Sequence, residues 1–148
     1  MMEQLDALYR EVILDHFKDP RNVGELLSPT IRAEGNNPLC GDEIAFSLHL
    51  DGDRVRDIRF QGKGCAISQA TASMLTEQMK GKSLAEVRQL IQAMKGLMQG
   101  QEPDPSVDLG DLETLAGVRK FPVRIKCAAL SWNVLEQGMA DYQAQSGR

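Results

Sequence analysis

The sequence predicts an α+β fold in which a small three-stranded antiparallel sheet packs against about five to six α-helices. Two observations carry this prediction. In the first half of the chain, hydrophobic and polar residues alternate, which is the pattern of strands with one buried face. Elsewhere, hydrophobic residues recur every three or four positions, which is the pattern of amphipathic helices.

The sheet is predicted from two alternating runs, residues 43–50 and residues 55–61. Asp51-Gly52 lies between them and is a hairpin-turn signal. A two-stranded hairpin is only marginally stable alone, so a third strand is needed, and we place it at about residues 30–35.

Helices are expected over residues 3–18, 65–81, 83–94 and 109–116, and from residue 127 to about 142. The first has a hydrophobic stripe that includes Leu8, Val12 and Ile13, and the helix of residues 83–94 opens with a capping-box sequence. Residues 99–108 are rich in glycine, proline and aspartate, and are expected to form a surface excursion.

Length and composition point to one domain spanning residues 1–148, since single domains typically hold ~50 to 250 residues. The apolar stretches are too short for a membrane helix, which needs ~20 apolar positions. The first six residues lack the features of a secretory signal, so a cytoplasmic location is expected. The net charge of −4, with scattered basic residues, makes nucleic acid an unexpected partner.

Three cysteines, Cys40, Cys65 and Cys127, stand where predicted elements begin or end. In a cytosolic protein, a thiol is more often a metal ligand or reaction centre than half of a structural disulfide. Cys65 and Cys127 are both expected at helix N-termini, where unpaired N–H groups and the macrodipole favour the thiolate. Asp42, two residues after Cys40, could add a carboxylate. Three thiolates and a carboxylate suit either a tetrahedral zinc ion or an assembling iron–sulfur cluster.

Purely structural roles for these residues remain alternatives. Free cysteine often acts as a small buried hydrophobe, and no Cys-x-x-Cys pair occurs, so a shared site requires the fold to bring the cysteines together. His16 and His49 are expected in surface or structural roles. Asp104, Asp108 and Asp111 are expected to form a solvated acidic surface, because their spacing matches no calcium loop.

Four segments carry a family resemblance, namely residues 37–42 (NPLCGD), 62–68 (GKGCAIS), 81–83 (GKS) and 121–132 (FPVRIKCAALSW). Together they resemble the IscU-like proteins of iron–sulfur cluster assembly, also described as NifU N-terminal-like. The fold of that family is a small antiparallel sheet packed with helices, with the cysteines gathered at one end. It agrees with the fold expected from the hydrophobic pattern.

Three features make the SufU-type branch of the family the better match. Lys126 stands where IscU-type scaffolds have a histidine before the third cysteine, so a histidine ligand there is excluded. Residues 121–126 do not reproduce the chaperone-recognition segment Leu-Pro-Pro-Val-Lys of IscU. Residues from about 99 to 118 resemble the insertion that marks the SufU branch.

The resemblance to SufU implies a zinc-dependent sulfur acceptor that takes persulfide sulfur from a pyridoxal-phosphate cysteine desulfurase of the SufS or IscS kind, and passes it into cluster assembly. It implies zinc held by Cys40, Asp42, Cys65 and Cys127, with Cys40 as the sulfur acceptor. Arg124 would support the site by offsetting its negative charge. One alternative is an IscU-type scaffold that assembles a transient 2Fe–2S cluster for client proteins. Another is a structural zinc module that acts only as an adaptor.

Overall fold

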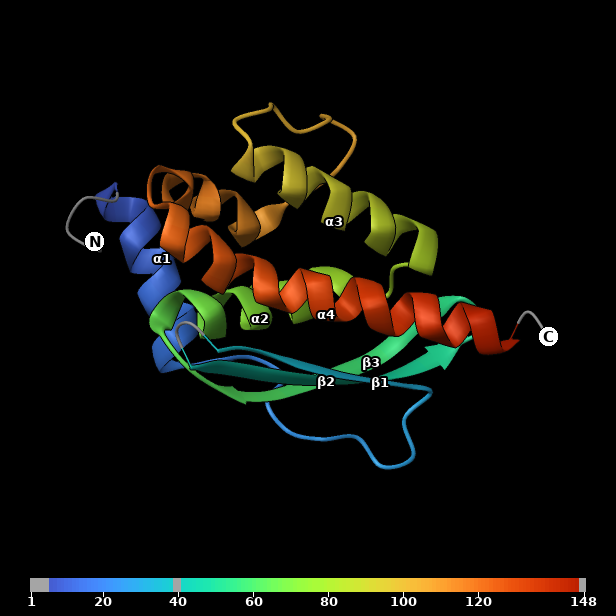
Figure 1. The fold of residues 1–148 in the computed structure, drawn as a ribbon. Coiled ribbons are helices and arrows are strands. Elements are labelled where there is room, and N and C mark those ends of the chain that lie inside the picture. The colour runs from blue at the N-terminus through green and yellow to red at the C-terminus, as the bar shows by residue number, and fades with distance from the viewer. Residues whose placement is uncertain (1–5, 39–40, 147–148) are drawn as a thin grey trace.

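The computed structural model describes residues 6–38 and 41–146, so the predictions for Cys40 and for residues 3–5 of the first helix lie outside the described residues. Along the chain the named elements are α1 (Ala7–Lys18), β1 (Ile31–Asn37), β2 (Asp42–Asp51), β3 (Arg54–Lys63), α2 (Ala66–Met79), α3 (Leu84–Met98), the 3₁₀ helix η2 (Gly110–Lys120) and α4 (Pro122–Ser146). Helices gather on one face of the sheet (Figure 1). The predicted α+β fold is confirmed.

The sheet is antiparallel, with strand order β1-β2-β3. At its centre Phe46 of β2 pairs with Ala33 of β1 and with Phe60 of β3, and all three are buried beneath the helices. Gly52 closes the β2–β3 hairpin with a φ of 62°, a conformation that glycine adopts without strain. The hairpin is therefore where the alternation placed it, and the third strand, β1, lies close to the predicted residues 30–35.

Helices α2 and α4 cover the sheet, and α3 lies outside them (Figure 1). Two glycines let α4 approach β1 closely. A Cβ at Gly138 of α4 would lie 2.6 Å from the Cβ of Ala33, and a Cβ at Gly35 of β1 would lie 2.7 Å from Cγ2 of Val134. Both distances are shorter than real contacts allow, so this helix–strand packing depends on the missing side chains.

Helix α1 departs from its expected stripe. Leu8 is 64% exposed, whereas Ile13 and His16 are fully buried. The buried residues of α1 therefore lie in its last two turns, because α1 packs against α2 and η2 there. Burial of His16 agrees with the structural role expected for it.

The helix predicted for residues 109–116 is a 3₁₀ helix that continues through Gly117 to Lys120. Its buried hydrophobic residues, together with the residue before it, are spaced three apart: Leu109, Leu112, Leu115 and Val118. A 3₁₀ helix has three residues per turn, so this spacing places all four on one face. A helix is therefore present where one was predicted over residues 109–116, but it is a 3₁₀ helix and it ends four residues later.

Helix α4 begins at Pro122, more than one turn before the predicted start at Cys127. Proline is favoured in the first turn of a helix, because its φ is already helical and its missing N–H has no partner to lose there. Cys127 is therefore inside the helix rather than at its N-terminus. Within the described residues, neither α4 nor any other helix combines the length and the apolar composition needed to cross a membrane.

Replacing Gly138 tests the close packing of α4 on β1. Gly138→Ala is expected to lower the free energy of unfolding by about 1 to 3 kcal/mol, because the new methyl group overpacks against Ala33. Gly96→Ala in α3 is the matched control. There the Cβ meets only the end of the Gln101 side chain, and the helix gains up to about 1 kcal/mol from replacing glycine. Chemical denaturation measures both, and a Gly138→Ala protein as stable as Gly96→Ala would contradict the packing argument.

Candidate metal centre

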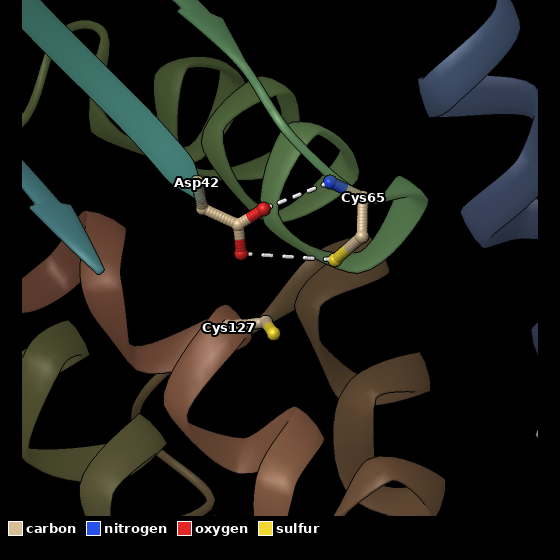
Figure 2. Close-up of side chains that lie close together, drawn as sticks. All are labelled: Asp42, Cys65 and Cys127. Atoms are coloured by element: carbon tan, nitrogen blue, oxygen red, sulfur yellow. Dashed lines mark hydrogen bonds between the residues drawn. The ribbon is translucent and has the colours of Figure 1, made fainter. Parts of the chain in front are cut away.

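Three of the four predicted ligands lie together at one end of the molecule. Asp42 is the first residue of β2, Cys65 precedes the first residue of α2, and Cys127 lies in the second turn of α4 (Figure 2). One ligand atom from each of them lies within 4.8 Å of those of the other two. The fourth predicted ligand, Cys40, lies outside the described residues.

Asp42 is a fully buried carboxylate, and it connects β2 to α2. Its Oδ1 accepts a hydrogen bond of 2.9 Å from the backbone N–H of Cys65, and its Oδ2 lies 3.8 Å from the Cys65 thiol (Figure 2). A buried carboxylate is costly without such partners. The contact therefore positions the Cys65 sulfur beside the Asp42 oxygens.

Gly64 makes room for this contact. Its φ is 153°, and a Cβ there would overlap Oδ1 of Asp42 and would lie 2.8 Å from Oγ of Ser68. Any other residue would displace the carboxylate or the start of α2. The predicted motif Gly62-Lys63-Gly64-Cys65 thus contains one glycine with a direct steric role at the centre.

Cys65 is the N-cap residue of α2, as expected, and it is partly exposed. Its side chain makes no capping hydrogen bond to the helix, so the sulfur is not committed to the backbone. Cys65 therefore combines partial exposure with a position at the positive end of the α2 macrodipole and a contact with the Asp42 carboxylate.

Cys127 lies in a different environment from the one predicted. It is fully buried and sits in the helix interior, where its thiol lies 3.7 Å from the carbonyl oxygen of Val123 one turn earlier. The macrodipole acts mainly within the first turn, so the argument that a helix N-terminus activates Cys127 was wrong. The nearby positive charge instead comes from Arg124.

Arg124 faces both thiols from the first turn of α4. Its Nη1 lies 3.9 Å from Sγ of Cys127. The hydrogen bond to Cys127, together with charge interactions with Cys65 and Cys127, raises the pKa of the Arg124 guanidinium above its usual value. The same interaction stabilises anionic sulfur, which matches the supporting position predicted for Arg124.

The donor set fits a tetrahedral metal ion. Zinc bonds of ~2.0–2.3 Å at tetrahedral angles place ligand atoms ~3.3–3.8 Å apart. Cys65 Sγ and Asp42 Oδ2 are already 3.8 Å apart, and the Cys127 ligand atom needs only a small closure from within 4.8 Å. Two sulfurs and a carboxylate oxygen are ligands that both zinc and iron accept.

Three aspartates in and just after the excursion, Asp104, Asp108 and Asp111, make two kinds of contact. Asp104 and Asp108 stabilise local turns by accepting backbone N–H groups of Ser106 and Gly110. Asp111 instead accepts a hydrogen bond from the buried ring of His16, 95 residues away in the chain. The prediction of a merely solvated surface therefore missed the contact of Asp111, because no local pattern signals a partner so distant in sequence.

Comparison with known proteins identifies the family. A model described as NifU-like N terminal domain matches residues 8–128, and the chain belongs to this family. It is 53% identical over 136 residues to the zinc-dependent sulfurtransferase SufU of Bacillus subtilis, covering 92% of each chain. It is 42% identical to the iron–sulfur cluster assembly scaffold protein IscU of Streptococcus pyogenes, covering 93% of this chain and 86% of that protein.

Comparison with solved structures agrees with this family. A crystal structure from Fervidobacterium islandicum, named as a candidate iron–sulfur cluster assembly scaffold protein for the SUF system, superposes with a TM-score of 0.82 at 36% identity. The match covers 86% of this chain and 93% of that chain. The similarity to SufU of Bacillus subtilis supports the assignment to the SufU-type branch, and Lys126, which is exposed, agrees with it.

Replacing Gly64 tests the geometry around Asp42. Gly64→Ala is expected to destabilise the protein more than Gly81→Ala. Both residues have positive φ and each substitution costs roughly 1 to 3 kcal/mol in backbone strain, but only Gly64 also faces a side chain. A Cβ at Gly81 meets nothing within 4 Å. Urea denaturation of both variants measures the difference, and equal losses of stability would show that the Asp42 contact imposes no steric demand on residue 64.

Proposed function

We propose that this protein acts in iron–sulfur cluster assembly as a zinc-dependent sulfur acceptor, which takes persulfide sulfur from a pyridoxal-phosphate cysteine desulfurase of the SufS or IscS kind. The observation that carries the proposal is the convergence of Asp42, Cys65 and Cys127 from three separate elements. The name of the Bacillus subtilis relative, a zinc-dependent sulfurtransferase, supports it. We place the activity in the cytoplasm.

Asp42, Cys65 and Cys127 would hold the zinc ion, with Cys40 as the fourth ligand. Only Gly41 separates Cys40 from Asp42, so the covalent chain limits their Cα atoms to a separation of about 7 Å. A bound zinc ion would balance the charge of the thiolates and keep them deprotonated near neutral pH. Arg124 contributes further positive charge from the protein itself.

The transfer step requires a thiolate and a donor persulfide. The Cys40 thiolate attacks the terminal sulfur of the donor persulfide, a new S–S bond forms on Cys40, and the old S–S bond breaks. The donor cysteine leaves as a thiolate, so no external oxidant or reductant is needed. Cys127 is a poor acceptor because it is fully buried, whereas Cys65 is partly exposed but engaged with Asp42.

The second candidate function is a scaffold that builds a transient 2Fe–2S cluster and transfers it to client proteins. The name of the Streptococcus pyogenes relative favours it, and cysteine thiolates are the usual ligands of such clusters. The chain has Lys126 in place of a histidine beside Cys127, which favours the sulfur acceptor. Downstream partners in either case are iron–sulfur assembly or client proteins.

Sulfur loading tests the role of Cys40. Cys40→Ala is expected to lose sulfur loading after incubation with a cysteine desulfurase and cysteine, because the attacking thiolate is absent. Intact-protein mass spectrometry measures the added sulfur, and thermal melting checks that the variant remains folded. Peptide mapping of the loaded wild-type protein locates the persulfide. Full loading of the Cys40→Ala variant would refute the assignment.

Metal content separates zinc-dependent transfer from scaffolding. Protein purified without oxygen is expected to be colourless and to contain about one zinc at the cysteine centre, and removing this zinc with a chelator is expected to abolish stimulation of the desulfurase. Elemental analysis and absorption spectroscopy measure the occupant. A stable visible chromophore that transfers to an apo-ferredoxin would favour the scaffold instead. Tightly held zinc without any sulfur loading would favour a structural adaptor.

A further inference from the structure

A second cluster of metal-ligating side chains lies away from the cysteines. It consists of His16 on α1, Glu77 on α2 and Asp111 on η2, whose ligand atoms lie within 4.8 Å of one another. Nε2 of His16 is 2.8 Å from Oδ2 of Asp111 and 3.7 Å from Oε1 of Glu77. Glu77 is twelve residues after Cys65, about 18 Å along α2, so the cluster is separate from the cysteine centre.

A buried serine, Ser73, orients the His16 ring by contacting its Nδ1 atom. The ring is fully buried, and its Nδ1 lies 2.8 Å from Oγ of Ser73, which is itself buried and also accepts the backbone N–H of Arg21. A serine hydroxyl can accept or donate. Ser73 can therefore partner Nδ1 in either tautomer, and it leaves Nε2 pointing at the two carboxylates. Histidines that bind metals usually have such a partner on the other ring nitrogen.

The side of the cluster toward solvent carries excess negative charge. The side chains of Glu77 and Asp111 are 44% and 54% exposed, and both face the same ring nitrogen. A neutral histidine can donate only one hydrogen bond from Nε2. The nearby Arg21 is already held by Asp15 at 2.7 Å, and this hydrogen bond is the main cause of its raised pKa, ahead of the charge of Glu77. One divalent cation would balance both carboxylates.

A serine hydrolase interpretation of the same residues fails on access. Ser73, His16 and Asp111 are linked in the order of a catalytic triad. Ser73 is fully buried, however, and its oxygen accepts the N–H of Arg21, so no substrate carbonyl can reach it. The exposed end of the cluster is formed by the carboxylates, which are suited to hold a cation rather than to attack a carbonyl.

We propose that His16, Glu77 and Asp111 form a binding site for a divalent transition-metal ion, of the zinc or manganese kind, at the junction of α1, α2 and η2. One imidazole nitrogen and two carboxylates are ligands for such ions. At tetrahedral angles these ligand atoms lie about 3.3 Å apart, so Asp111 must move outward by about 0.5 Å from its present hydrogen bond. Asp111 lies at the start of η2 with half its side chain in solvent, so this movement meets little resistance.

A cation at this junction would hold η2 against the two helices beside it (Figure 1). The residue Phe121 alone separates η2 from α4, the helix that carries Arg124 and Cys127. The cation would therefore stabilise the segment from which α4 continues toward the cysteine centre. The role assigned to it is structural, and it does not depend on which metal or cluster the cysteines bind.

Zinc titration of the full-length, chelator-treated protein tests the proposal. Isothermal titration calorimetry is expected to show two bound equivalents per chain. Glu77→Gln and Asp111→Asn are each expected to lower the zinc affinity of one of these two equivalents. The expected loss is more than roughly 10-fold, which is the cost of losing an outer-shell partner of a metal ligand. Glu113→Gln is the matched control, because it removes the same charge from an exposed position on η2 outside the cluster, and it is expected to keep both.

A Cys65→Ser variant distinguishes this proposal from the proposed function. If the cysteine centre does not bind zinc, the wild-type protein is expected to bind one equivalent of zinc at the His16 cluster. The Cys65→Ser variant is then expected to keep this equivalent, and the Glu77→Gln variant to lose it. Zinc is also expected to raise the melting temperature of Cys65→Ser but not of the Cys65→Ser/Glu77→Gln double variant. Equal zinc affinity and stoichiometry in the wild type, Glu77→Gln and Asp111→Asn would overturn the proposal and assign any additional zinc to adventitious surface binding.

Discussion

The hydrogen bond between the buried Asp42 carboxylate and the backbone N–H of Cys65 is the contact on which the candidate metal centre depends. It joins the start of β2 to the start of α2, and it brings a carboxylate oxygen and a sulfur to a separation of 3.8 Å. The amide N–H of Cys65 gives the buried carboxylate a hydrogen-bond partner, and Arg124 supplies positive charge beside the two thiols of the centre. The contact requires glycine at residue 64, since any side chain there would overlap Oδ1 of Asp42.

The third ligand reaches the centre by a different route. Cys127 is positioned by the packing of α4 across β1, and this packing is close because Gly35 and Gly138 leave room for the opposing side chains. A small shift of α4 along the sheet would carry Cys127 away from Asp42 and Cys65. The geometry of the centre therefore rests on backbone packing at positions that carry no chemistry themselves, which is usual where ligands come from elements distant in the chain.

The two candidate cation sites lie at different points along α2, and they differ in ligand chemistry. The cysteine centre offers soft sulfur ligands at the N-terminus of the helix, whereas the His16 cluster offers a ring nitrogen and two carboxylates near its C-terminus. Both are assembled around α2, which packs against α1, α4, β3 and η2. Helix α2 thus contributes to both sites, through Cys65 at its N-terminus and Glu77 near its C-terminus. The continuous segment of η2 and α4 also contributes to both, through Asp111 and Cys127.

The sequence by itself determined the strands, most of the helices and the identity of the candidate ligands, because alternation, helical spacing and the residues around each cysteine are local properties. The predicted start of the last helix at Cys127 was too late, because proline at residue 122 suits the first turn of a helix and α4 begins there. The 3₁₀ helix was missed although the three-residue spacing from Leu109 to Val118 was visible, since such long 3₁₀ helices are uncommon. Only the tertiary structure decided that Asp42, Cys65 and Cys127 share one centre, that Arg124 rather than a helix terminus supplies charge to Cys127, and that His16 meets Asp111. The contacts within the cysteine centre and between His16 and Asp111 join residues far apart in the chain, so packing of helices on the sheet, not any local pattern, brings them together. The contact of Arg124 with Cys127 is local, but it depends on α4 starting at Pro122.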